Sequence, residues 1–144
     1  MTTKAYKIDN PTAVIGELAK QLQKKYGDEA LALMVPILRE YGFHSGTRLA
    51  KKLADRDFGG RVEAWLEPLT KAGLSEVVEK SPSHVAIRGT SCPLNLEGTS
   101  RALCDACMAI DQGLVSALAE HEITLSIEKS MARGDDCCSV RFTI

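Results

Sequence analysis

The C-terminal end of the chain carries a strand–turn–strand pattern: residues 123–144 are ITLSIEKSMARGDDCCSVRFTI. Apolar and polar side chains alternate strictly over 123–129, which is the pattern of a strand with one buried face. The turn at 133–136 contains Gly134, a residue that tolerates a positive φ, and 137–144 has a strand pattern again. This end of the chain therefore predicts an antiparallel hairpin.

A second pair of short strands precedes this hairpin. Residues 74–80 and 84–90 flank Ser-Pro-Ser at 81–83, which is a turn signal. Between the two hairpins, residues 100–119 have the apolar periodicity of a helix. We therefore expect an antiparallel sheet of two hairpins with one helix packed on it.

The N-terminal half of the chain predicts helices. Asn10-Pro11 is a helix start, with Asn as the cap and Pro in the first turn. Gly27 ends this helix and Asp28 caps the next one, in which Pro36 predicts a kink or an early break. The expected helices span 11–26, 28–41, 47–54 and 61–72, with Gly42 and Gly73 as stops.

Together these elements predict a single α+β domain over residues 1–144. Its helical part is 1–73, and 74–144 holds the sheet and the last helix. A chain of 144 residues builds one core of ordinary size. Its 44% apolar and 26% charged residues are the composition of a globular domain.

Charge and hydropathy exclude several classes of partner. The net charge of −1 argues against nucleic-acid binding through phosphate neutralisation. No apolar run approaches the roughly 18 residues of a membrane helix, and the first residues contain no apolar export segment. We therefore expect a cytoplasmic protein with a small-molecule partner; a homo-oligomer is left open.

The five cysteines gather in the last third of the chain, at positions 92, 104, 107, 137 and 138. An odd number without an export segment does not indicate a disulfide framework. Cys104, Cys107 and Asp111 are spaced i, i+3 and i+7, so they project from one side of the helix. Such a column suits a nucleophile or a metal site, although both cysteines also suit the core as small apolar residues.

The last strand divides the adjacent cysteines between its two faces. Alternation sends Cys138 toward the core, where it can approach Cys107 if the helix covers the sheet. The same alternation places Cys137 on the polar face, near Arg141. Cys138 is again equally suited to the core as a small apolar side chain.

Cys92 follows a strand in the loop Gly89-Thr-Ser-Cys92-Pro, a place from which a scaffold presents residues to a pocket. As a nucleophile it needs a base or a cation, and His84 and Arg88 on one face of the preceding strand are the nearest in sequence. The alternative is a zinc or small-ligand sensor domain in which Cys92, Cys104, Cys107 and Cys138 are the metal ligands.

A third hypothesis is that the protein is a transcription regulator, because residues 47–90 follow the helix–turn–helix–hairpin order of a winged helix. The second of these helices carries Glu63, Trp65 and Glu67. Helices that enter a DNA groove are richer in Arg, Lys, Asn and Gln, so this reading is disfavoured.

The segment 90–144 resembles the L-2-amino-thiazoline-4-carboxylic acid hydrolase family. The matching motifs are Cys92-Pro93-Leu94, Leu103-Cys104-x-x-Cys107-x-x-x-Asp111-x-Gly113, Ala132-Arg133-Gly134-Asp135-Asp136-Cys137-Cys138 and Arg141-Phe142. The ending Gly134-Asp135-x-x-Cys138 also resembles, more distantly, the 4-vinyl reductase domain, a small-molecule-binding fold that holds a cysteine-liganded metal in some members.

The resemblance implies hydrolytic opening of a cyclic C–N bond in a five-membered isothiourea that bears a carboxylate. Cys92 would attack the amidine-like carbon, and Asp105 or Asp111 would hold the protonated nitrogen. His84 would transfer the proton. The residues expected to bind the substrate are Arg88, Arg133 and Cys137, and no cofactor is expected.

Overall fold

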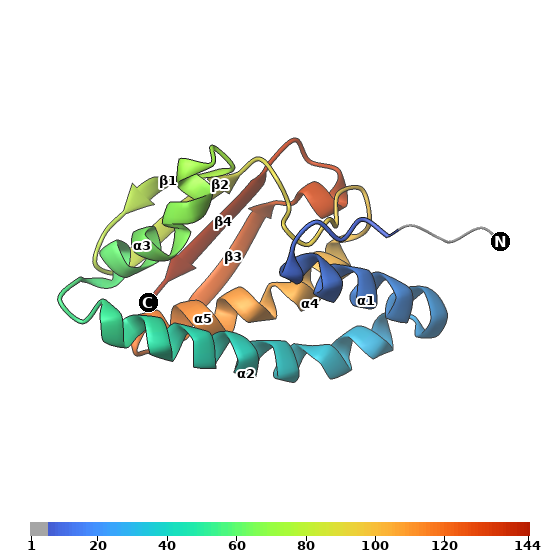
Figure 1. Cartoon of the computed structure of the whole chain (residues 1–144), viewed down its shortest axis with the longest axis horizontal. Coiled ribbons are helices and arrows are strands. Elements are labelled where there is room, and N and C mark those ends of the chain that lie inside the picture. The colour runs from blue at the N-terminus through green and yellow to red at the C-terminus, as the bar shows by residue number, and fades with distance from the viewer. Residues whose placement is uncertain (1–5) are drawn as a thin grey trace.

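The computed structural model describes residues 6–144, so the first five residues, which belong to the expectation about export, lie outside it. As expected, helices precede two hairpins that enclose a helical segment, although the helices differ in number and bounds (Figure 1). The elements are α1 Pro11–Tyr26, α2 Asp28–Lys52, α3 Phe58–Lys71, β1 Ser75–Lys80, β2 His84–Gly89, α4 Arg101–Cys107, α5 Ala109–Ala119, β3 Thr124–Lys129, the 3-10 turn η1 Met131–Arg133 and β4 Cys138–Thr143.

The four strands form one antiparallel sheet in the order β1-β2-β4-β3, which confirms the α+β class and both hairpins. The hairpins join through β2 and β4, where Val85 lies opposite Phe142 and Ile87 opposite Val140. These side chains point toward α3 and α5, and the Phe142 ring meets Trp65 of α3 edge-on, with centroids 6.4 Å apart. The helices therefore cover one face of the sheet and leave the other open.

The second helix is longer than expected. α2 runs for 25 residues through Pro36 and Gly42, so the expected break, the expected stop and the separate helix over 47–54 are all wrong. Gly27, rather than Asp28, occupies the N-cap position. Gly42 stays helical because the backbone of α5 passes against it: a Cβ there would lie 2.0 Å from the carbonyl oxygen of Ile110.

This contact between α2 and α5 is made by glycines from both helices. A Cβ on Gly113 would lie 2.0 Å from the carbonyl oxygen of Arg39, and one on Gly46 would lie 2.3 Å from that of Leu114. Since real side chains never approach carbonyl oxygens so closely, only glycine fits at these positions.

The expected helix over 100–119 is divided at Met108 into α4 and α5. Around α4 a second apolar cluster forms between α1, the start of α2 and the loop after β2, with Leu31, Leu96 and Leu103 buried in it. Among the described residues, Arg101–Ala119 alone is long and apolar enough to span a membrane, and 56% of its most apolar window is buried inside the protein. Burial of this extent also occurs in the core helix of a globular domain.

We predict that Gly42→Ala and Gly113→Ala each lower the free energy of unfolding by about 2–4 kcal/mol, because the added methyl group forces the helices apart. Alanine has the higher helix propensity, so intrinsic preference alone would change stability in the opposite direction. Urea denaturation followed by circular dichroism measures the effect. Gly89→Ala at the end of β2 is the control, because its Cβ would lie no nearer than 3.7 Å to another side chain, an ordinary van der Waals contact, and it should be close to neutral.

Candidate functional site

Four of the five cysteines converge from three segments of the chain. Cys92 lies in the loop after β2, Cys104 and Cys107 lie on α4, and Cys138 begins β4. Burial raises the pKa of the Cys107 thiol to about 12, and the neighbouring Cys104 and Cys92 add to the rise. The pKa of Cys138 is also raised, by burial first and then by Cys92 and Cys104. These mutual effects show that the thiols share one half-buried region.

The loop that carries Cys92 is held in place by its own turn and by α1. The Cys92 carbonyl accepts the Asn95 N–H at 3.0 Å, and the Cys92 N–H donates to a Glu97 carboxylate oxygen at 3.2 Å. From α1, Asn10 Nδ2 donates to the Pro93 carbonyl and Lys20 Nζ to the Asn95 carbonyl, both at 3.0 Å. The helical N-terminal part of the chain therefore positions the candidate nucleophile.

Ser130 lies beside Cys104 and was not expected from the sequence. Its side chain is buried, and its hydroxyl lies close enough to the Cys104 sulfur to oppose the rise that burial causes in the pKa of Cys104. The Ser130 N–H donates to the Asp135 carboxylate at 2.8 Å. Gly134-Asp135, part of the sequence motif, thus fixes the turn that presents Ser130 to the thiols.

Arg133, which was expected to bind the substrate, is held by a neighbouring carboxylate, whereas Arg101, for which the sequence suggested no role, lies beside a thiol. Arg133 ion-pairs with Asp135 at 2.5 Å, so its guanidinium supports the turn. Arg101, on the first turn of α4, binds Asp105 at 2.8 Å and lies close enough to Cys104 to lower the pKa of that thiol slightly. Its spacing of three residues from Cys104 on a helix is the signal that would have identified it.

Cys137 lies beside Arg88, so the expectation that it lies near Arg141 is wrong. Cys137 is buried, and a hydrogen bond with its sulfur is the main reason that the pKa of Arg88 is raised. The register explains the pairing, because Arg88 lies opposite Ser139, two residues from Cys137. The predicted pair of substrate-binding residues is thus brought together, next to the end of β2 that leads to Cys92.

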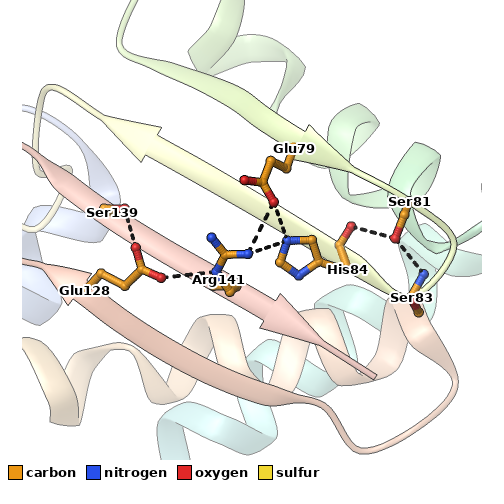
Figure 2. A network of polar contacts seen from close by, with 7 residues as sticks. All are labelled: Glu79, Ser81, Ser83, His84, Glu128, Ser139 and Arg141. Atoms are coloured by element: carbon orange, nitrogen blue, oxygen red, sulfur yellow. Dashed lines mark hydrogen bonds and ion pairs between the residues drawn. The ribbon is translucent and has the colours of Figure 1, made fainter.

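His84 occupies the other end of β2, on the open face of the sheet (Figure 2). Its Nε2 lies 2.9 Å from a Glu79 carboxylate oxygen and 2.7 Å from an Arg141 guanidinium nitrogen. The hydrogen bond with His84 is the largest cause of the lowered pKa of Glu79. Five residues of strand, roughly 17 Å, separate His84 from Gly89 near the thiols. The geometry therefore does not support His84 as the proton-transfer partner of Cys92.

The two candidate aspartates differ in their surroundings. Asp105 is exposed and ion-paired with Arg101, at the rim of a groove of about 200 Å³ that Arg39 and Gln112 also line. Asp111 follows Cys104 by two helical turns and has no hydrogen-bond or ion-pair partner within residues 6–144. Burial raises the pKa of Asp111 to about 7, so this carboxyl group exchanges a proton near neutral pH.

The metal alternative gains no support from the arrangement. In the described part of the chain, no group of three or more His, Cys, Asp or Glu side chains is placed to hold a metal ion. Cys92, Cys104, Cys107 and Cys138 are neighbours, but they do not form a preformed zinc site. Neither the groove at Asp105 nor an open cleft of about 690 Å³ between the C-terminal ends of α2 and α5 is lined by a cysteine.

Solved structures share this fold at low sequence identity. The phenol-responsive sensory domain of the transcription activator PoxR, solved with phenol, superposes with a TM-score of 0.66 at 20% identity, over 97% of this chain and 77% of that one. Subunit 3 of a trafficking protein particle complex from Naegleria fowleri, covalently bound to palmitic acid, gives a TM-score of 0.58 at 18% identity, over 92% and 93% of the two chains.

The sequence comparisons identify the family. No curated protein matches the chain. The sequence model of the L-2-amino-thiazoline-4-carboxylic acid hydrolase family matches residues 9–142, so the match includes the helical N-terminal part as well as the cysteine motifs. The chain therefore belongs to the L-2-amino-thiazoline-4-carboxylic acid hydrolase family.

Proposed function

We propose that this protein is a hydrolase that opens the cyclic C–N bond of a 2-amino-thiazoline-4-carboxylate-like substrate, with the thiol cluster as its reaction centre. The observation that carries the proposal is the convergence of Cys92, Cys104 and Cys138, whose thiols raise one another's pKa values. In this proposal the acid is Asp111, which lies one helical turn after Cys107 along the chain and has a pKa raised by burial. Membership of the family supports the reaction class.

Cys92 is the nucleophile in this proposal. A thiol whose pKa is raised to about 12, such as Cys107, is not ionised at neutral pH and attacks slowly. Burial also raises the pKa values of Cys104 and Cys138. Cys92 is half-buried in a loop with a fixed backbone, which suits a group that must meet a substrate entering from solvent.

The reaction then has two balanced steps. The Cys92 sulfur bonds to the amidine-like carbon and the ring C–N bond breaks. The ring nitrogen takes one proton from the Cys92 thiol and one from Asp111, which leaves the exocyclic amino group as an iminium. Water next adds to the same carbon, the bond between this carbon and the enzyme sulfur breaks, and carbamoyl-cysteine leaves. The water loses one proton to Asp111 and one to the thiolate, so enzyme and charge are restored.

Cations at the edge of the cluster would bind the substrate carboxylate. Arg88 lies beside Cys137 at the end of β2, and Arg101 lies beside Cys104 on α4. An exposed guanidinium binds a carboxylate through two parallel hydrogen bonds. Asp105, adjacent to Arg101, would hold the protonated amino group.

A ligand-binding sensor is the second candidate function, and the likeness to the PoxR sensory domain favours it. That likeness extends over 97% of this chain, and the related protein was solved with phenol. In this case the half-buried apolar thiol region binds a small molecule without converting it. Turnover of the substrate distinguishes the two candidates, because a sensor returns its ligand unchanged.

We predict that Cys92→Ser lowers the turnover of 2-amino-thiazoline-4-carboxylate by at least about 100-fold, because a serine hydroxyl lacks the acidity and nucleophilicity of a thiol. Mass spectrometry of carbamoyl-cysteine formation measures the rate. His84→Gln is the matched comparison, since the structure places it far from the thiols, and it should stay close to the wild-type rate. Unchanged turnover in Cys92→Ser would remove the nucleophile from the proposal.

We also predict that Asp111→Asn changes how stability depends on pH. The pKa of about 7 in the folded protein lies above the ordinary aspartic acid pKa of 3.8, so the folded protein binds an extra proton between these pH values. The contribution of Asp111 to stability is therefore complete below pH 3.8 and is lost as the pH rises through 7.

The measurement is the free energy of unfolding of both proteins across pH 4–8. Asp111→Asn should reduce the loss of stability with rising pH in this window, and it should be the more stable protein above pH 7. Asp105→Asn serves as the control, because Asp105 is exposed and ion-paired. Equal slopes for wild type and Asp111→Asn would show that this carboxyl group is ionised in the folded protein.

A further inference from the structure

The outer side of α2 carries an apolar stripe. Leu33, Ile37 and Tyr41 follow one another at intervals of four residues and are 75%, 71% and 57% exposed. Single exposed apolar residues are ordinary, but a run at helical spacing forms one continuous patch.

The position of the stripe separates it from the core. Gly42 and Gly46 face α5 on the inner side of α2, where backbones are in contact. The stripe residues are instead exposed. Within residues 6–144, no element packs on the side of α2 that faces away from α5 (Figure 1). α2 is therefore apolar on two sides: the inner side packs against α5, and the outer side is exposed.

The size of the patch suits an interface between proteins. Three side chains exposed to this degree present on the order of 400 Å². With the side chains that flank them, they approach the roughly 800 Å² that each partner buries in a standard interface. A long, straight and exposed helix is also a surface that a second copy of itself can match.

Charge at the ends of the stripe specifies the direction of pairing. Glu29 lies near its N-terminal end and Arg48 near its C-terminal end, and neither has an ion-pair partner in the described chain. Antiparallel pairing brings Glu29 of one copy near the partner's Arg48. Parallel pairing would instead bring together the basic last turns, which contain Lys51 and Lys52.

We propose that two copies of this protein form a dimer through antiparallel α2 helices, with a two-fold axis near Ile37. Leu33 of each copy then packs against the partner's Tyr41, and such self-complementary pairing is the rule for two-fold interfaces. The stripe faces away from α4 and α5, so pairing leaves the thiol cluster uncovered. The inference is independent of the proposed reaction.

The first test is the molar mass in solution, measured by sedimentation velocity over a range of concentrations. Wild type should sediment as a species of twice the 15.6 kDa chain mass. Ile37→Glu should weaken the dimer by at least about 100-fold, because it places two like charges at the centre of the apolar contact. Val14→Glu on α1, another exposed apolar position, should leave the dimer intact.

The second test addresses the direction of pairing with surface charges alone. Glu29→Arg and Arg48→Glu should each weaken the dimer, and the double variant should restore it, because exchange of the two charges recreates the pair. Circular dichroism verifies that each variant is folded. A wild type that stays monomeric at high micromolar concentration, a dimer that Ile37→Glu does not change, or a double variant that fails to restore association would each overturn the proposal.

Discussion

At Gly42 and Gly113 the backbones of α2 and α5 meet without side chains between them, and the positions of the other elements follow from that contact. α5 packs on the sheet with one side and on α2 with another, so its direction is fixed. α4 continues α5 past Met108 and therefore lies over the loop after β2. The two cysteines of α4 reach Cys92 and Cys138 because this crossing is so close.

The sheet separates two chemically different environments. Beyond the end of its covered face, the thiols lie in or beside the second apolar cluster, and burial raises the pKa of Cys104, Cys107 and Cys138. On its open face, the hydrogen bond from His84 and then the charge of Arg141 lower the pKa of Glu79 (Figure 2). Alternation along β2 and β4 sends neighbouring residues to opposite faces, so short distances in sequence become large differences in environment.

The same alternation explains why the neighbours of His84 and Arg88 could not be predicted from the sequence alone. His84 and Arg88 share a face of β2, as expected, but they lie at opposite ends of the strand. Arg88 has Cys137 as its neighbour, whereas His84 joins Glu79 and Arg141, which come from other strands. Which residue lies beside which depends on strand register, and register between distant strands is not encoded in local pattern.

Local signals determined the α+β class, both hairpins, the first helix with its Asn10 cap and the family motifs around the cysteines, because alternation, capping and turn chemistry act over a few residues. Tertiary structure alone decided that α2 continues through Pro36 and Gly42, that α4 and α5 are distinct, and that Ser130 and Arg101 join the thiols. These features arise from contacts between segments far apart in the chain, where a glycine that locally signals a helix stop instead provides space for another backbone.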